Sequence, residues 1–396
     1  MIDVYSKALD KYTKVNRVIG RVEGLQPGPT VVFFAGIHGN ETSGVFAIKS
    51  CLQSLTKDHV RGVVYGISGN LRALKKHQRY INEDLNRLWT KPHIDIIKSK
   101  TVLNPDEAEL LELLEVLNDI LKNEVAPFYF IDLHTTSSRT LPFITINDAL
   151  INRKFSQEFP VPIVLGIEEY LSGPLLSYIN ELGYVSLGFE SGQHDELNAI
   201  TYHEAFVYLS LKKSGVLDEQ SSLDFSYYHN LLFLATSGSK AVFEVVYLHS
   251  LKNEDAFSML NGFDSFQPIK KGIPLAIHNN KELKAPTTGS IFMPLYQKRG
   301  SEGFFIIKPI KPFFLRLSAL LRKVRFDGVL VLLPGVSWAN KKEGILQVNL
   351  NIAHFFAKSF FHLLGYRSRH ITETHLRLNN RERVAKSKLY KKEAWY

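Results

Sequence analysis

The stretch TVVFFAGIHGNE, residues 30–41, decides the fold class. Its first seven residues are a run rich in β-branched and aromatic side chains that ends in glycine, which is typical of a buried strand. The polar residues that follow interrupt this run as a loop. Residues 41–55 then place apolar side chains three or four positions apart, as a core-facing helix requires. A strand, a loop and a helix in this order predict one unit of an α/β fold.

The same order recurs along the chain up to about residue 215. A helix start is marked by Asn104, a capping residue, and by Pro105 at the first helical position. Further strands that lead into polar loops are predicted in RGVVYGIS (61–68), FYFIDLH (128–134) and VSLGFE (185–190). This alternation predicts an α/β domain with a mixed, largely parallel sheet that is flanked by helices. Functional loops of such a sheet lie at the ends of its strands.

The remainder of the chain is predicted to form two further parts. Residues 216–310 contain short strand-like runs broken by glycine, proline and asparagine turns, which predicts a smaller, mainly β domain that contributes to the site. Residues 311–396 form an extension to which we assign no role. Within it the sequence predicts a basic amphipathic helix over 313–326, a strand over 326–336 and a helix over 348–364. The predicted catalytic domain is residues 1–215.

The composition is that of an ordinary globular protein. With 396 residues, of which 45% are hydrophobic, the chain can bury a sizeable core in more than one domain. The single cysteine, Cys51, lies in an apolar helical segment and is interpreted as structural. We find no basic segment followed by an apolar stretch at the amino terminus and no membrane span, so we expect a cytoplasmic protein. The sequence leaves a homo-oligomer open.

The net charge of +9 is concentrated near the carboxyl end. Residues 367–396 hold nine lysines and arginines and three glutamates, so nine minus three gives +6 there. One hypothesis is a non-catalytic protein that uses this tail and the basic segment 316–326 to bind nucleic acid or an acidic surface. The tail has few aromatic side chains and no recognition motif, and runs of charge are usually solvated. We therefore do not expect nucleic acid as a partner.

Two histidines and a glutamate form the first candidate site. His38 and Glu41 stand three residues apart where a strand end meets a helix start, and His134 stands at the end of another strand. Two histidines and one carboxylate are the ligand set of a hydrolytic zinc site, which leaves a fourth position for water. A lone H-x-x-E pair arises by chance, but the glycines around His38 and the position of His134 favour a metal site. Asp132 is placed to orient the imidazole of His134.

The second candidate is RYINEDLNR, residues 79–87, which has two arginines, two amides and two acids without helical periodicity. The planar fork of an arginine suits a carboxylate or an oxyanion. For either arginine alone, a solvated charged loop is the better interpretation. The combination with a metal site is what favours a role in chemistry. No nucleophile elbow, P-loop or dinucleotide fingerprint is found.

These motifs make the chain similar to the succinylglutamate desuccinylase and aspartoacylase family, relatives of the zinc carboxypeptidases. The matching strings, in the family's order, are GIHGNE, RYINEDLNR, IDLHTT and FESGQH, with weaker similarity in LNGFDSFQPIKKG and IFMPLYQ. The resemblance implies a zinc-carboxypeptidase-like fold and a hydrolase that deacylates a small N-acyl amino acid. It also implies one zinc ion per chain, held by His38, Glu41 and His134, with Glu190 as the general base and acid.

The resemblance implies roles for four further residues. Arg79 would polarise the scissile carbonyl and stabilise the oxyanion, and Asn86 and Arg87 would hold the carboxylate of the substrate. Tyr296, in the string PLYQ, resembles a tyrosine that the second domain lends to the site. A zinc carboxypeptidase that acts on peptides stays an alternative, because the arginine loop does not separate the two activities.

The chain also departs from the family pattern. Members that cleave acidic acyl groups are expected to supply a cation for the distal carboxylate, yet no arginine occurs between residues 154 and 298. Arg139 and the lysines of that interval are the candidates to replace it. Glu190 is followed by Ser-Gly-Gln-His, and the His194 of this string is interpreted either as a group near the substrate or as a solvent-facing loop histidine.

Overall fold

The computed structural model describes residues 1–217, 223–252, 254–324, 326–341, 344–349, 351–352, 364–370 and 375–396. No helix within these ranges combines the length and the apolar character that crossing a membrane requires.

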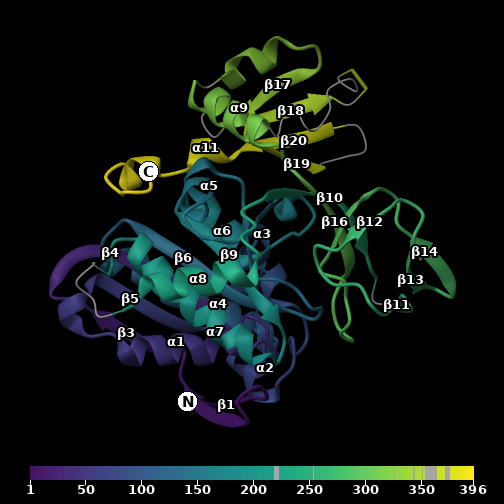
Figure 1. Cartoon of the computed structure of the whole chain (residues 1–396). Coiled ribbons are helices and arrows are strands. Elements are labelled where there is room, and N and C mark those ends of the chain that lie inside the picture. Colours follow the sequence, from purple (N-terminus) through teal and green to yellow (C-terminus); the bar gives the residue numbers. More distant parts are fainter. Residues whose placement is uncertain are drawn as a thin grey trace.

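A mixed sheet forms the centre of the molecule, and the described residues give it eleven strands (Figure 1). Neighbours β5, β4, β6 and β9 run parallel to one another, and so do β7, β8 and β10, which run opposite to the first set. The outer strands pair in antiparallel fashion. The order is β12 (Pro268–Ile269), β15 (Gly289–Phe292), β16 (Glu302–Pro309), β10 (Val242–Ser250), β8 (Ile163–Leu165), β7 (Phe143–Ile146), β9 (Val185–Gln193), β6 (Phe128–Thr136), β4 (Gln26–Ala35), β5 (Arg61–Ser68) and β3 (Val18–Glu23).

Helices cover both faces of this sheet. On β4, Val31 and Phe33 point into one apolar core while Val32 and Phe34 point into the other, as the alternation of a strand buried on both faces requires. The first core includes α1 (Ser43–Ser54), α2 (Leu71–Lys76), α5 (Leu150–Ser156), α7 (Leu197–Lys213) and α8 (Phe225–Ala235), and the second includes α3 (Lys91–Ser99), α4 (Pro105–Asn123) and α6 (Leu175–Glu181). The predicted fold class, a mixed and largely parallel sheet flanked by helices, is confirmed.

Within residues 216–310, the segment after α8 is mainly β. It contains β10, β12, β15 and β16 of the central sheet and a small antiparallel sheet of β11 (Phe257–Met259), β13 (Pro274–His278) and β14 (Lys281–Lys284). Because β10 pairs in parallel with β8, the β segment continues the sheet that carries the candidate site. A hairpin of β1 (Ile2–Ser6) and β2 (Lys11–Val15) lies at the amino terminus.

The carboxyl-terminal extension forms a small α/β unit with its own apolar core, at the top of Figure 1. The predicted basic helix is present as α9 (Pro312–Lys323). The strand predicted over 326–336 is wrong, because a 3-10 helix, η4 (Phe326–Leu332), occupies this run, whose short apolar sequence does not distinguish helix from strand. The helix predicted over 348–364 falls mostly outside the described residues. The sheet has the order β17 (Val336–Asn340), β18 (Ile345–Asn349), β20 (His375–Asn380) and β19 (Tyr366–His370).

The last sixteen residues return to the α/β domain through α11 (Arg381–Val384) and η5 (Ser387–Tyr390). The hydroxyl of Tyr390 donates to the Phe128 carbonyl oxygen at 2.6 Å and accepts from the Val185 amide at 3.0 Å. The indole of Trp395 donates to the Tyr129 hydroxyl at 3.2 Å, and both tail aromatics belong to the core of that domain. The end of the basic tail is therefore an integral part of the α/β domain.

Candidate metal centre and active site

The two parallel strands β4 and β6 bring the candidate ligands together. His38 and Glu41 lie on the turn between β4 and α1, and His134 lies near the end of β6. The turn packs closely on α2, since a Cβ atom at Gly39 would lie 2.1 Å from the carbonyl carbon of Ala73. Only glycine allows this approach. The close packing on α2 therefore requires glycine at position 39, next to His38.

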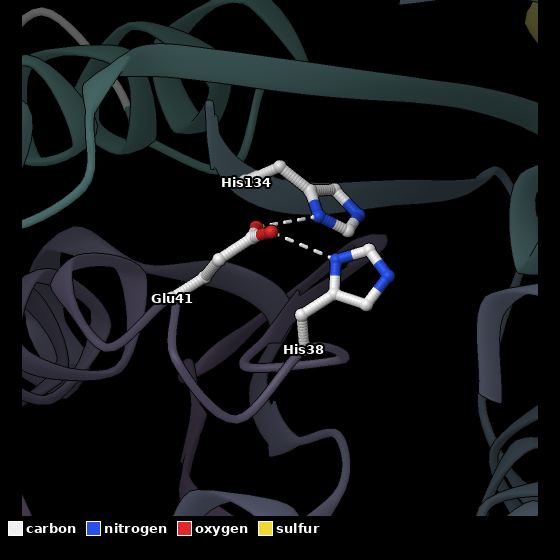
Figure 2. Close-up of side chains that lie close together, drawn as sticks. All are labelled: His38, Glu41 and His134. Carbon is white, nitrogen blue, oxygen red and sulfur yellow. Dashed lines mark hydrogen bonds and ion pairs between the residues drawn. The ribbon is translucent and has the colours of Figure 1, made fainter. Parts of the chain in front are cut away.

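Figure 2 shows the two imidazoles converging on one carboxylate. Glu41 Oε1 lies 2.8 Å from His38 Nδ1, and Glu41 Oε2 lies 2.9 Å from His134 Nδ1. All three residues are buried, and one ligand atom from each lies within 4.8 Å of the others. The two histidines and the glutamate of the first predicted site therefore meet in space.

Two further carboxylates fix the orientation of the imidazoles. His38 Nε2 lies 3.1 Å from Asp84 Oδ1, and His134 Nε2 lies 2.8 Å from Asp132 Oδ2. A proton on each Nε2, donated to these aspartates, leaves each Nδ1 as a lone pair that faces the other ligands. The donor set, its burial and these outer carboxylates fit a divalent cation with nitrogen and oxygen ligands.

The electrostatics of the cluster favour positive charge at its centre. Burial acts against the charged forms, but the neighbouring imidazoles hold the pKa of Glu41 well below its ordinary value. Burial also opposes protonation of His134, yet Asp132 and Glu41 raise the pKa of this imidazole well above its ordinary value. A metal ion satisfies this preference without added protons.

Glu190 lies beside the cluster on β9, opposite His134 in the pairing of β9 with β6. Its side chain is buried, and its Oε2 atom has no hydrogen-bond partner among the described residues. Burial raises the pKa of this carboxyl to about 7. A carboxylate with one unengaged oxygen and a pKa near neutrality has the properties of a general base.

The RYINEDLNR segment is held in place by a buried carboxylate at the start of α4. Asp106 accepts hydrogen bonds from the backbone amides of Ile81, Asn82 and Glu83, at distances between 2.6 and 3.2 Å. The role of Asp106 is not evident from the sequence, because its partners lie more than twenty residues away. This contact explains how a segment without helical periodicity is fixed beside the site.

Asp84, whose role is likewise not evident from the sequence, connects this segment to the candidate metal ligands. Its Oδ2 accepts from Arg79 Nη2 at 2.9 Å and from Arg79 Nε at 3.2 Å, while its Oδ1 accepts from the Asn86 amide at 2.9 Å and contacts His38. Arg79 Nη1 also lies 3.7 Å from Glu41 Oε1. Arg79 is therefore a fixed cation at the edge of the cluster.

Asn86 and Arg87 also reach the site. Asn86 Oδ1 accepts from the Leu175 amide at 2.9 Å, which ties this segment to α6. Arg87 Nη2 lies 3.0 Å from Glu302 Oε1, on β16. Although burial favours its neutral form, Arg87 and the hydroxyl of Ser301 keep the pKa of Glu302 below its ordinary value. The Arg87 guanidinium thus faces a charged carboxylate that lies 215 residues further along the chain.

One pocket of about 1010 Å³, including its open mouth, joins these residues. It is lined by His38, Glu41, Arg79, Asn86, Arg87, His134, Glu190 and His194, together with residues of η3 (Ile167–Glu169), α6 and the 293–305 segment. All the predicted catalytic, substrate-binding and metal-binding residues except Tyr296 line this pocket. His194 Nδ1 lies 2.7 Å from Thr135 Oγ1, so this histidine is a pocket residue and not a solvent-facing one.

The structure does not bring Tyr296 to the pocket. Its hydroxyl donates to the Leu260 carbonyl oxygen at 2.9 Å and accepts from the Phe263 amide at 3.1 Å, within the β segment. Its neighbours Leu295 and Gln297 do line the pocket, so the string PLYQ reaches the site with the tyrosine turned away. Arg139, the arginine named as a substitute cation, is exposed and is not a lining residue either.

Comparisons with known proteins agree with this geometry. Residues 27–205 match the family model described as succinylglutamate desuccinylase/aspartoacylase catalytic domain. Residues 27–205 belong to this family. The predicted resemblance is confirmed, and the matched residues contain both histidines of the cluster, both glutamates and the arginine segment.

Relatives of this family match over a limited length. Aspartoacylase of Mus musculus is 32% identical over 114 residues, which is 28% of this chain and 36% of the mouse protein. Succinylglutamate desuccinylase of Photorhabdus laumondii is 30% identical over 138 residues, 33% of this chain and 40% of that protein. The chain thus aligns with well under half of either relative.

Solved structures of other proteins share the fold. The crystal structure of succinylglutamatedesuccinylase/aspartoacylase from Rhodobacter sphaeroides superposes with a TM-score of 0.55, covering 74% of this chain and 88% of that chain at 15% identity. The product-bound ectoine utilization protein EutE (DoeB) from Ruegeria pomeroyi gives the same TM-score at 16% identity. These likenesses extend over more of the chain than the sequence matches do.

Proposed function

We propose that the protein is a zinc-dependent amidohydrolase that cleaves the amide bond of a small N-acyl amino acid. The observation that carries this proposal is the juxtaposition of the His38, Glu41 and His134 cluster with the unengaged Oε2 of Glu190 in one pocket. A metal ligand set alone is compatible with a structural ion. A buried carboxylate with a raised pKa beside it supports hydrolysis.

The proposed chemistry divides between the ion and the side chains. A zinc ion in such a site supplies Lewis acidity and allows water to act as a nucleophile near neutral pH. Glu190 Oε2 takes the proton of the attacking water and passes it to the leaving nitrogen. Arg79, held by Asp84, donates to the oxyanion that develops on the scissile carbonyl. Arg87 binds a carboxylate of the substrate.

The cover of the pocket supports a small substrate. The segment between β15 and β16 contacts the α/β domain through Gln297 Oε1, which accepts from Asn40 Nδ2 at 3.0 Å, and through Arg299, which donates to the Tyr80 carbonyl oxygen at 2.6 Å. The Tyr296 amide also donates to Ser137 Oγ at 3.2 Å. A segment fixed in this way leaves less room for a long peptide than an open groove, which disfavours the carboxypeptidase alternative.

The test is hydrolysis of N-acyl amino acids by the chelator-treated protein after addition of zinc, with magnesium as the control ion. We expect release of the free amine with zinc and none with magnesium, because nitrogen ligands suit zinc. Release from a peptide substrate, but from no N-acyl amino acid, would favour the carboxypeptidase instead. No hydrolysis of either kind by the zinc-loaded protein would refute the proposal.

A further inference from the structure

The cations of the pocket are already engaged. Among the described lining residues, Arg79 and Arg87 are the only lysine or arginine side chains. None of the lysines between residues 154 and 298, which were candidates to replace a distal arginine, lines the pocket. Arg79 is paired with Asp84 at 2.9 Å, and Arg87 is paired with Glu302 at 3.0 Å. A substrate carboxylate can bind Arg87 only in competition with Glu302. A second carboxylate finds no lysine or arginine in this lining.

The wall beyond these pairs is suited to an uncharged group. It includes the apolar side chains of Ile146, Ile167, Leu171, Leu176, Leu295 and Phe305, beside the uncharged polar side chains of Thr145, Asn147 and Ser177. Asn147 Nδ2 donates to Ser177 Oγ at 3.0 Å, so this amide is already engaged. The carboxylate of Glu168, itself buried, lies in the same wall. A substrate carboxylate placed here would lose its hydration and meet no lysine or arginine among the described lining residues, whereas an apolar side chain would gain by leaving water.

We propose that the substrate carries a single carboxylate and an apolar group, as in an N-acyl derivative of an aliphatic or aromatic amino acid. This inference rests on the proposed function and narrows it. Glu302 is assigned as a specificity-determining residue, because its charge occupies Arg87, which can then serve at most one carboxylate of the substrate. Dicarboxylates such as N-acetylaspartate are then poor substrates, although the relatives that match this chain are named for such compounds.

The zinc-loaded full-length Glu190→Gln variant lacks the proposed general base, so the affinity for an intact substrate can be measured without its hydrolysis. Titration calorimetry with intact N-acetylleucine and N-acetylaspartate measures the preference directly. We expect N-acetylleucine to bind roughly 100-fold more tightly, the effect of burying a carboxylate without a partner. Equal or tighter binding of N-acetylaspartate would overturn the inference.

A second variant tests the role assigned to Glu302. In the same background, Glu302→Gln is expected to narrow the difference in affinity between the two ligands by roughly tenfold, because it removes a negative charge beside Arg87 and leaves this arginine able to serve the second carboxylate of N-acetylaspartate as well. Glu282→Gln, on exposed β14, is the matched control and is expected to leave the difference unchanged. If Glu302→Gln and Glu282→Gln show the same preference for N-acetylleucine over N-acetylaspartate, the assignment of Glu302 is refuted.

Rates of the wild-type protein keep the two proposals distinct. Hydrolysis of N-acetylleucine and N-acetylphenylalanine in preference to N-acetylaspartate supports both. Hydrolysis of N-acetylaspartate or N-succinylglutamate in preference to the apolar substrates overturns the substrate class and leaves the amidohydrolase in place. No hydrolysis of any of them by zinc-loaded protein removes the proposed function and this inference together.

Discussion

Asp84→Asn is the substitution that tests how the site is held. One carboxylate oxygen of Asp84 contacts His38 Nε2 and accepts from the Asn86 amide, and the other accepts twice from Arg79. Every partner of this side chain is thus a donor. An asparagine of the same shape has one oxygen and one NH₂ group, so in either orientation a donor faces a donor. The substitution must disturb either the metal ligand or the arginine.

The size of the effect follows from the contacts that are lost. Loss of an outer-shell partner of a metal ligand costs about 10–100-fold in metal affinity, or roughly 1.4–2.7 kcal/mol. We expect a zinc dissociation constant raised by this factor when Asp84→Asn competes with a chromogenic chelator. Asn82→Ala, at an exposed position of the same segment, is the control. Zinc affinity and kcat of Asp84→Asn that are both within about twofold of wild type would refute the reasoning, because neither the metal ligand nor Arg79 would then be disturbed.

Three further perturbations have defined outcomes. Tyr390→Phe removes a buried hydroxyl that bonds two backbone groups and should lower the free energy of unfolding by about 2–4 kcal/mol in urea titration, while exposed Tyr12→Phe should change it little. Glu190 must be ionised to act as a base, so kcat/KM should fall as pH decreases through its pKa. This decrease in kcat/KM should occur at or below about pH 7, because a bound cation lowers the pKa of Glu190. A kcat/KM that stays constant down to pH 5 would contradict the role of Glu190 as a general base. Arg79→Lys keeps a charge but loses the fork bonded to Asp84, so kcat should fall about 100-fold with zinc retained, and unchanged kcat would exclude Arg79 as oxyanion donor.

The candidate metal centre could be predicted because its three residues stand at the ends of neighbouring parallel strands. The apolar run before His38 and the run before His134 each indicate a buried strand, and the carboxyl ends of parallel strands meet at one edge of a sheet. The spacing of His38 and Glu41 on one turn then leaves few arrangements. Local sequence therefore sufficed for the ligands and for the fold class.

The supporting contacts could not be predicted, because they join residues that are distant in sequence and depend on tertiary packing. Glu302 lies 215 residues beyond Arg87, on a strand of the β segment. Tyr296 carries a motif of the family, but its hydroxyl is bonded within the β segment, and a motif does not fix the direction of one side chain. The basic residues of the tail from residue 381 onward indicate a solvated segment, whereas its aromatic residues Tyr390 and Trp395 pack into the core of the α/β domain.

The central claim, a zinc site coupled to a general base, is tested most directly by zinc content and hydrolysis measured on three proteins. Wild type is expected to hold one zinc ion per chain and to hydrolyse an N-acyl amino acid. Glu190→Gln should retain zinc without turnover, and His38→Ala should lose both. Wild-type protein that binds no zinc after reconstitution, or Glu190→Gln that turns over at the wild-type rate, would contradict the account.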